Sequence, residues 1–451
     1  MYHMYSLLLT LGFVVLLPRF LVDALRHGKY VAGFRERFGS LVETSTNKPV
    51  IWLHCVSVGE TQAARPLADL LSQKFPQYSL VVSTITLTGQ NLAREIFQAK
   101  ATRVFYFPFD WRWSVRRTLR AIKPTVVLLM ETELWPNFLH ECDRAHVPVV
   151  LINGRISAKS ERRYRMVRGF LKEVVGDLTM AIMQAEADKE RLQQLGMPSE
   201  KLFVCGSLKF DAVGMPPSSL LAATFRQRFG LNDSDVGLIL AASTHAPEER
   251  ILLESFQILA KKQTHKLKMM IAPRHPERFS EVASLIQRSG LSWARRSSAD
   301  SDSDRRADVI LLDTIGELPA VYPLAKVVFV GGSIANFGGH NILEPAAVGG
   351  CIITGAHTHN FQAIVKEFVQ ARAILQLPAM TDREMVVELS RTLEAILSEP
   401  DRCDALRRRA ALLVKQNQGA TERTIQLLEP LLIKAFGQSH PATLAAGPRL
   451  K

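Results

Sequence analysis

The sequence predicts an α/β protein built from two doubly wound, parallel-sheet domains. At 451 residues the chain is longer than one hydrophobic core usually supports, so two domains are expected. Its composition, 47% hydrophobic and 22% charged, is that of a globular protein. Near-continuous apolar runs alternate with helical patterns along most of the chain, which is typical of parallel strands covered on both faces.

Apolar runs mark the expected strands, and a segment rich in proline and serine divides them into two series. The runs of the first series lie at 50–56, 79–86, 101–107, 125–130, 147–153 and 178–183. Those of the second series lie at 236–243, 267–273, 308–313, 326–332 and 350–355. Because a polar turn and a helical pattern follow each run, we expect two doubly wound domains that face each other across a cleft.

The domain boundaries follow from this pattern. We expect a membrane-associated helix at 1–30, a first Rossmann-like domain at 31–211, a linker at 212–220 and a second Rossmann-like domain at 221–398. The remaining residues, 399–451, have the pattern of helices that pack back across the domains, followed by a tail.

The first thirty residues are apolar at their start and basic at their end. No charged residue occurs from Tyr5 to Leu17, and Arg19, Arg26 and Lys29 follow. The run is shorter than the ~20 apolar residues of a full membrane span, and a cleaved signal peptide would carry its positive charge before the run. Positive charge after the run keeps the rest of the chain on the cytoplasmic side. A buried first helix is the alternative; we expect a membrane anchor, spanning or half-inserted.

The net charge of +13 is concentrated in the first half of the chain. Residues 1–210 hold 28 Lys and Arg residues against 18 Asp and Glu residues. Such a surface suits an anionic partner: an acidic lipid, a phosphorylated molecule or a nucleic acid. The basic residues lack the interleaved aromatic side chains of a base-stacking platform, so nucleic acid is the least favoured of the three.

The five cysteines are scattered, odd in number and without C-x-x-C spacing. This pattern argues against a disulfide framework and a zinc site, and it suits a reducing compartment. Histidine occurs in no H-x-x-x-H pair, so we expect no metal centre.

Acidic residues follow two of the runs in the first series, at the strand ends where ligands bind in such folds. After the first run, S-V-G-E places Glu60 three residues beyond Ser57. This spacing fits a capping box, and it fits equally a general base facing the cleft. After the fourth run, ETELWPN supplies Glu131 and Glu133. Acids at successive strand ends favour transfer to a hydroxyl group, which is a poor nucleophile until its proton is removed.

Basic residues stand at corresponding places in the second half. Arg274 follows the run LKMMIAP, between prolines that fix its direction, and is a natural partner for phosphate or carboxylate. The segment 313–322, DTIGELPAVY, places a glycine and an acid at a helix start. Lys209, in GSLKFD just before the linker, is a candidate to reach a leaving phosphate or the substrate carboxylate, although by pattern alone it is an ordinary lysine.

A glycine-rich segment, FVGGSIANFGGHNILEPAAVG, spans residues 329–349. It has the order strand, glycine-rich turn and helix, and Pro345 suits the first turn of a helix. This order aims free backbone N–H groups at an anion. Glycine-rich turns are common, so the segment gains meaning only beside the other motifs.

Eight motifs, in order along the chain, lie between about Gly33 and Phe361. They are HCVSVGE, ETELWPN, INGRIS, GSLKFD, STHAPEE, PRHPER, DTIGEL and GGSIANFGGHNILEPAA. Together they resemble the 3-deoxy-D-manno-octulosonic acid (Kdo) transferases of lipopolysaccharide biosynthesis. The resemblance implies a glycosyltransferase-B fold whose N-terminal part associates with the cytoplasmic side of the inner membrane. It also implies CMP-Kdo as donor, a phosphorylated tetraacyldisaccharide lipid A precursor (lipid IVA) as acceptor, and no metal or other cofactor.

The resemblance assigns roles residue by residue. Glu60 corresponds to the proton acceptor, and Glu131 and Lys209 correspond to positions that stabilise the transition state. The CMP site corresponds to Pro273, Arg274, Ile315, Gly316, Glu317, Asn341, Ile342, Leu343 and Glu344. The chain departs from the family pattern at Ile315, where we expect methionine, and at Cys55, where we expect alanine. Neither change alters a charge or a hydrogen-bond donor.

The residues and the resemblance together predict direct displacement at the anomeric carbon, with inversion. Glu60 removes the proton of the acceptor hydroxyl, while Arg274, Lys209 and the helix N-termini favour the departing phosphate. Backbone amides of the GGHN turn lie near the CMP phosphate, and Glu344 binds the ribose hydroxyls. The sequence does not set the number of Kdo residues transferred.

Three other functions share some of these features. A sugar-nucleotide epimerase can have the same two-domain architecture, but it has no need of a membrane anchor or a basic acceptor face. A non-catalytic, membrane-tethered nucleotide sensor has no need of Glu60, Glu131 and Lys209 together. A nucleic-acid-binding protein is suggested by the net charge alone.

Overall fold

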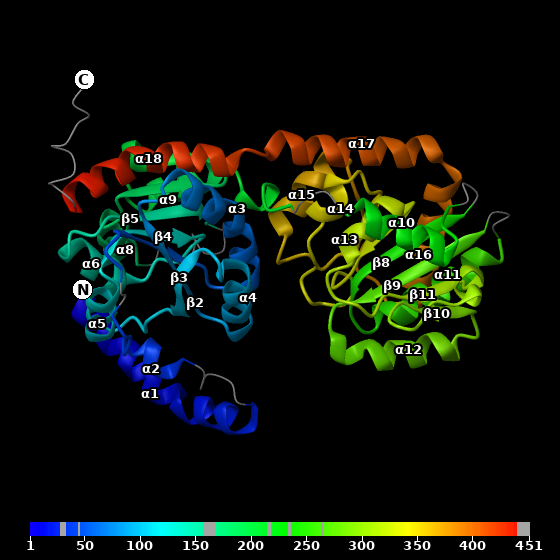
Figure 1. The fold of residues 1–451 in the computed structure, drawn as a ribbon, viewed down its shortest axis with the longest axis horizontal. Coiled ribbons are helices and arrows are strands. Elements are labelled where there is room, and N and C mark those ends of the chain that lie inside the picture. Colours follow the sequence, from blue (N-terminus) through cyan, green and yellow to red (C-terminus); the bar gives the residue numbers. More distant parts are fainter. Residues whose placement is uncertain are drawn as a thin grey trace, which may run out of the picture. The chain divides into compact units, whose positions relative to one another are not determined.

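The computed structural model describes residues 1–27, 33–43, 46–156, 167–213, 218–232, 236–262 and 266–439, with the side chains of 19–27 and 438–439 left aside. The chain divides into two compact units (Figure 1). The first unit comprises Met1–Ala212 and Asn417–Lys451, and the second comprises Val213–Gln416. Part of the expected linker, 214–217, and the end of the expected tail, 440–451, lie outside the described residues.

The first unit is built on a seven-stranded parallel sheet with the order β3-β2-β1-β4-β5-β6-β7. Its strands are β1 Val50–His54, β2 Ser79–Thr84, β3 Ala101–Tyr106, β4 Pro124–Met130, β5 Val149–Gly154, β6 Met180–Met183 and β7 Leu202–Val204. Its helices are α1 Tyr2–His27, α2 Phe34–Arg37, α3 Val58–Lys74, α4 Leu87–Phe97, α5 Arg112–Ile122, α6 Pro136–Arg144, α8 Arg168–Gly176, α9 Glu186–Gln194, η1 Ser199–Lys201, η2 Leu208–Phe210 and α18 Ala420–Ser439. Helices α3, α4 and α18 cover one face of the sheet, and α5, α6, α8 and α9 cover the other.

The second unit repeats this design with the strand order β10-β11-β9-β8-β12-β13-β14, again all parallel. Its strands are β8 Gly237–Thr244, β9 Leu267–Pro273, β10 Trp293–Arg295, β11 Val309–Leu311, β12 Val327–Val330, β13 Ile352–Thr354 and β14 Leu375–Gln376. Its helices are α10 Ser219–Phe229, α11 Glu248–Ala260, η3 Pro276–Arg278, α12 Phe279–Arg288, η4 Asp302–Arg306, α13 Leu318–Val321, η5 Tyr322–Leu324, α14 Leu343–Ala347, α15 Gln362–Gln370, α16 Asp382–Ser398 and α17 Pro400–Asn417. Helices α11, α12, α16 and α17 bury their apolar sides against one face of this sheet.

Each predicted apolar run contains an observed strand, and three further strands were not predicted. These three, β7, β10 and β14, lie at edges of the sheets and are only two or three residues long. They are too short and too exposed to give the apolar run that marks the central strands, whose residues are buried throughout in β1, β2 and β9. The fourth edge strand, β3, is six residues long and was predicted.

The two last helices belong to different units. Helix α17 contributes Cys403 and Leu406 to the core of the second unit. Helix α18 contributes Ile425, Leu428 and Leu432 to the core of the first. The chain therefore returns to the first unit only after α17, whereas the sequence pattern placed the end of the second domain at residue 398.

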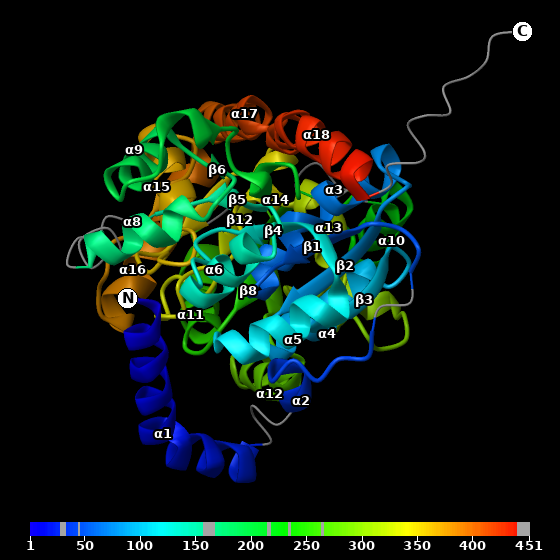
Figure 2. The same ribbon diagram turned by 90° about the vertical axis from the view of Figure 1, so that its left-hand side faces the viewer.

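Helix α1 is anchored to the first unit by its first turns (Figure 2). The Tyr2 hydroxyl donates to Asp177 at 2.8 Å, and the Tyr5 hydroxyl donates to Asp110 at 2.9 Å. Contacts continue at Thr10, which accepts the indole N–H of Trp111 at 3.0 Å, and at Phe13, whose ring centroid lies 5.0 Å from that of Trp111. Other positions of the helix expose large apolar side chains: Leu7, Leu8, Leu11, Val14, Val15, Leu16 and Leu17. Among the described residues, no helix is both long enough and apolar enough to cross a membrane.

Candidate active site

Glu60 lies in the first turn of α3, directly after the carboxyl end of β1. Ser57 is the N-cap of this helix, and its hydroxyl donates to Glu60 Oε1 at 3.1 Å. Glu60 Oε2 accepts a hydrogen bond from the backbone N–H of Val56 at 2.8 Å. Ser57 Oγ also accepts the backbone N–H of Glu60 at 3.5 Å, which is the N-cap half of the capping box that the S-V-G-E spacing indicated. The reciprocal half is not formed, because the Glu60 side chain accepts the N–H of Val56 and not that of Ser57. These contacts hold the carboxyl group in one orientation.

The environment of Glu60 favours its protonated form. The residue is only 8% exposed. Burial, and after it the negative charge of Glu131, raises the pKa of Glu60 to about 8, against hydrogen bonds from Val56 and Ser57 that lower it. A carboxyl group with a pKa near the working pH is suited to accept a proton in a reaction, which an ordinary capping glutamate is not.

Glu131 follows the carboxyl end of β4 and forms an ion pair with Lys209. The distance from Lys209 Nζ to Glu131 Oε1 is 2.7 Å, and both side chains are about four-fifths buried. The backbone of Glu131 has a φ of 56°, in the left-handed region that a glutamate rarely adopts. Such strain is kept where the surrounding structure requires one side-chain direction, and it is frequent at functional sites.

Two neighbours complete this cluster: Glu133, which the sequence placed at the same strand end without a role of its own, and Asn153, which was not predicted as a site residue. Glu133 is held by the indole N–H of Trp135 at 2.7 Å, and burial raises the pKa of Glu133 to about 7. Asn153, at the end of β5, has a φ of 52°, and its Oδ1 accepts the backbone N–H of Leu208 at 3.0 Å. Asn153 thereby positions η2, the short helix that carries Lys209. An asparagine at the end of an apolar run is the only sequence signal for this role, because asparagine tolerates positive φ.

The residues predicted to bind the donor lie in the second unit, at the carboxyl end of its sheet. Pro273 is the buried last residue of β9, and Arg274 follows it with an exposed side chain. The backbone N–H of Arg274 donates to Thr244 O at 3.0 Å, which ties the end of β9 to the end of β8. The guanidinium group of Arg274 is thus presented at the strand end and remains open to a ligand.

The carboxylate of Glu344 is positioned by Asn341. Asn341 Nδ2 donates to Glu344 Oε1 at 3.2 Å, and Asn341 Oδ1 accepts the backbone N–H of Leu343 at 3.0 Å. Burial raises the pKa of Glu344, while the Asn341 hydrogen bond and the positive charge of Arg274 lower it. Ile342 and Leu343 are buried, so they fix the start of α14 and leave Asn341 and Glu344 to meet a ligand.

The third predicted donor segment forms a turn before α13. Ile315 is 81% exposed, and Gly316 has a φ of 85°. Glu317 accepts two hydrogen bonds from Arg296, at 3.0 and 2.8 Å. An exposed isoleucine has no packing role, which agrees with a position that is free to differ from the family pattern.

A buried glutamate that sequence reasoning missed organises the glycine-rich segment. Glu248, fully buried at the start of α11, accepts backbone N–H groups from five residues at 2.8–3.2 Å: His245, Gly332, Ser333, Ile334 and Ala335. These amides are therefore occupied by the protein's own carboxylate. Gly331 lies so close to β8 that a Cβ atom there would come within 2.5 Å of Ser243 O.

The GGHN turn itself retains uncommitted amides, among them those of His340 and Asn341. Gly339 N–H donates to Gly332 O at 2.8 Å. Within the described part of the chain, no acceptor is recorded for the backbone N–H groups of His340 and Asn341. These two amides, beside the Arg274 guanidinium, are the part of the predicted phosphate site that the structure leaves available.

A pair of histidines stands at the same edge. His245 Nε2 lies 2.8 Å from His340 Nε2, so one ring donates and the other accepts. Burial, followed by repulsion from neighbouring imidazole and guanidinium groups, lowers the pKa of His245 to about 4 and that of His340 to about 3. Phe337 stacks on His245 with ring centroids 4.1 Å apart. The pair is therefore neutral at pH 7. Through it, His245 packs against two residues of the glycine-rich segment, His340 and Phe337.

The structure thus brings the predicted residues together in two groups. In the first unit, Glu131 forms an ion pair with Lys209, and the negative charge of Glu131 raises the pKa of Glu60. Asn341, Glu344 and Arg274 form a polar group in the second. Within the residues that the structure describes, no group of three or more His, Cys, Asp or Glu side chains could hold a metal ion.

Comparison with known proteins identifies the family. Residues 32–212 match the family model described as 3-deoxy-D-manno-octulosonic-acid transferase (kdotransferase). The 3-deoxy-D-manno-octulosonic acid transferase of Haemophilus influenzae is 33% identical over 90% of this chain and 92% of its own length. That of Bordetella pertussis is 35% identical over 85% of this chain and 87% of its own.

The fold is shared more widely. The crystal structure of the UDP-GlcNAc 2-epimerase from Neisseria meningitidis aligns with 85% of this chain and all of its own, with a TM-score of 0.53 and 16% identity. At this identity the likeness shows the architecture alone. The two transferases, similar along most of their length, show more: the chain belongs to the 3-deoxy-D-manno-octulosonic acid transferase family of glycosyltransferases.

Proposed function

We propose that this protein transfers Kdo from CMP-Kdo to the tetraacyldisaccharide 4'-phosphate precursor of lipid A (lipid IVA), without a metal, in the synthesis of the lipopolysaccharide inner core. The observation that carries the proposal is the cluster of Glu60, Glu131 and Lys209 at strand ends of the first unit, in a member of the Kdo transferase family. A transferase needs a base for the acceptor hydroxyl, and the cluster supplies one.

In the proposed reaction Glu60 is the general base. Its carboxylate accepts the proton of the acceptor hydroxyl as that oxygen forms a bond to the anomeric carbon of Kdo. The raised pKa supports this role, because a more basic carboxylate is a stronger proton acceptor. The ion pair of Glu131 with Lys209 holds a positive charge close to the same strand ends, where it can stabilise the charge that develops.

The donor is proposed to bind the second unit. The bond between the anomeric carbon and the CMP phosphate oxygen breaks, and the phosphate departs with the electron pair. Arg274 and the free amides of the GGHN turn suit that anion, and Glu344, oriented by Asn341, suits the ribose hydroxyls. The backbone of 315–317 and the strand end at Pro273 complete the proposed CMP site.

A single displacement of this kind inverts the anomeric configuration. The proposed reaction needs one base, Glu60, and no covalent carboxylate, and it leaves Glu131 in its ion pair with Lys209. A glycosyl adduct on either residue, detected by mass after incubation with CMP-Kdo alone, would overturn inversion.

We propose further that the protein works at the cytoplasmic side of the inner membrane. Helix α1 exposes a series of leucine and valine side chains, and Phe34 and Trp113 of the same unit are also about half exposed. Apolar and aromatic side chains exposed beside basic residues suit the interface of an anionic membrane, where the lipid acceptor resides.

A transfer assay with product masses tests the proposal. Purified full-length protein is incubated with CMP-Kdo and the tetraacyl lipid A precursor, and the lipid product is analysed by mass. A lipid heavier by one or more whole Kdo units supports the proposal and gives the number of transfers. An unchanged lipid with CMP still bound to the protein would refute it and favour a nucleotide-sugar epimerase, whose fold is shared.

A further inference from the structure

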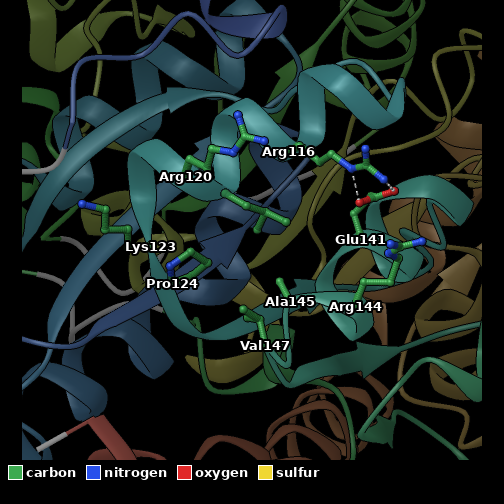
Figure 3. A pocket seen from close by; sticks show the side chains of 9 residues that line it. Arg116, Arg120, Lys123, Pro124, Glu141, Arg144, Ala145 and Val147 are labelled. Carbon is green, nitrogen blue, oxygen red and sulfur yellow. Dashed lines mark hydrogen bonds and ion pairs between the residues drawn. The ribbon is translucent and has the colours of Figure 1, made fainter.

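A concavity of about 480 Å³ lies on the first unit, at the C-terminal ends of α5 and α6 and the start of β4 (Figure 3). Its lining residues are Arg116, Leu119, Arg120, Lys123, Pro124, Glu141, Arg144, Ala145 and Val147. In Figure 3, Arg120 and Lys123 lie on one side of the concavity and Glu141 and Arg144 on the other. We refer to it as the α5–α6 pocket.

The lining is strongly basic, and its single acid is already paired. Glu141 is 4% exposed and accepts hydrogen bonds from Arg112 Nε and Arg116 Nε, each at 2.6 Å. Burial raises the pKa of Glu141, but the hydrogen bonds from Arg116 and Arg112 outweigh it and hold the pKa below its usual value. Glu141 is therefore a fixed negative charge that orients Arg116 and is compensated by two arginines.

The remaining cations have little or no compensation. Arg120 and Arg144 are exposed, and neither forms an ion pair within the described part of the chain. Lys123 reaches only Glu43, at 3.4 Å, and both of these side chains are more than 70% exposed, so the pair is weak. Among the residues that the structure describes, these three cations around one concavity therefore have no acidic partner other than the exposed Glu43.

Helix dipoles give only part of the explanation. Arg120 and Arg144 lie in the last turns of α5 and α6, where a cation complements the partial negative charge of the helix end. The helix dipole accounts for one cation at the end of each helix, Arg120 on α5 and Arg144 on α6. It does not account for Arg116, one turn earlier, or for the convergence of the side chains on a single concavity.

The pocket is separate from the candidate active site. Pro124 begins β4 and lines the pocket, whereas Glu131 follows the other end of the same strand. Seven residues of strand span roughly 20 Å at about 3.3 Å per residue. The pocket therefore lies at the amino edge of the sheet, and Glu60, Glu131 and Lys209 lie at the carboxyl edge.

We propose that the α5–α6 pocket binds the phosphate group of an organic phosphate ester. Arg116, held in place by Glu141, offers an ordered guanidinium group, and Arg120, Lys123 and Arg144 add charge around it. Leu119, Pro124, Ala145 and Val147 form an apolar part of the wall for the organic portion. Two sources carry this chemistry: a phospholipid headgroup and a soluble phosphate ester. The inference does not depend on the proposed transfer reaction.

The test measures binding of full-length protein to two probes, with CMP in excess to fill any nucleotide site. The probes are glycerol 3-phosphate in solution and vesicles of phosphatidylglycerol with phosphatidylcholine, compared with phosphatidylcholine alone. The test variant is Arg120→Ser/Arg144→Ser. The matched control is Arg94→Ser/Arg117→Ser, which removes two exposed arginines of the same unit outside the pocket, one of them in the last turn of α4.

The proposal predicts that the test variant binds at least one probe roughly tenfold more weakly, and that the control changes binding by less than about twofold. Loss confined to vesicles identifies a lipid headgroup, and loss confined to glycerol 3-phosphate identifies a soluble ester. Equal loss in both variants would show that general surface charge drives binding and would overturn the proposal. Binding of neither probe by the parent protein, or unchanged binding by the test variant, would also overturn it. Unchanged melting temperatures verify that both variants are folded.

Discussion

Lys209 Nζ lies 2.7 Å from Glu131 Oε1, and this ion pair joins η2 to the carboxyl end of β4. The pair is assembled by backbone features: the positive φ of Glu131 turns its side chain toward η2, and Asn153 holds η2 by accepting the N–H of Leu208. Glu60, next to this pair, has a raised pKa partly because of the Glu131 charge. The charge of Glu131 therefore acts on two partners, the ammonium group of Lys209 and the carboxyl group of Glu60.

The transfer rate is predicted to rise with pH. Glu60 has a pKa of about 8 and acts in its deprotonated form, so kcat/KM increases as pH rises through about 8 and levels off above it. Glu131→Gln removes a negative charge that raises this pKa, so the midpoint of the profile shifts to lower pH. A pH profile of kcat/KM for both proteins checks the prediction. A flat profile between pH 6 and 9 would contradict it.

The coupling of Glu131 and Lys209 is predicted to be larger in catalysis than in stability. The pair is about four-fifths buried, so its coupling free energy in unfolding is expected to be about 1–2 kcal/mol, within the range for contacting residues. Lys209→Met is expected to lower kcat by about 10²-fold or more if it stabilises developing charge, with CMP affinity unchanged. A double-mutant cycle with Glu131→Gln, measured by denaturant unfolding and by kcat, separates the two effects. Full activity in the double variant would rule out a catalytic role for the pair.

Glu248 is predicted to support the glycine-rich segment. In Glu248→Gln an NH₂ group replaces one carboxylate oxygen and faces backbone N–H donors. The hydrogen bonds to that oxygen are lost, and the amide N–H groups of the glutamine repel the backbone N–H groups that face them. We expect a loss of roughly 2–4 kcal/mol in the stability of the second unit, together with weaker CMP binding. Thermal unfolding and CMP titration measure both. Glu254→Gln, on the exposed side of the same helix, is the control, and an equal effect there would contradict the role of Glu248.

The central strands could be predicted from sequence because each is buried on both faces and reads as an apolar run. The edge strands β7, β10 and β14 could not, since partial exposure removes that pattern. The clustering of acids at strand ends followed from the rule that parallel strands share a carboxyl edge. The resemblance to a family then singled out Glu60, Glu131 and Lys209 among the polar residues, which spacing alone could not do.

Contacts between distant segments remained hidden. Glu248 binds amides more than eighty residues away, and His245 pairs with His340 across a similar separation. The sequence around these residues does not indicate either contact, because a glutamate or a histidine at the start of a helix is also typical of an ordinary capping residue. Glu60 is a different case, because the spacing allowed two roles, a capping box and a general base. Ser57 does cap the helix, but the Glu60 carboxylate accepts the N–H of Val56, so the capping box is only half formed. Burial, and after it the charge of Glu131, raises the pKa of this carboxyl group, which suits a base.

The most direct test of the account is Glu60→Gln, because glutamine keeps an oxygen that can accept the Val56 N–H but cannot accept a proton at neutral pH. Transfer activity, CMP affinity and melting temperature are measured together. Glu384→Gln, in the exposed Thr381 capping box of α16, is the control for capping alone. We predict that Glu60→Gln loses about 10²–10⁴-fold in transfer while CMP affinity and melting temperature stay near those of the parent protein. Retained transfer, or a loss of transfer that only follows a loss of folding, would contradict the role of Glu60 as the base.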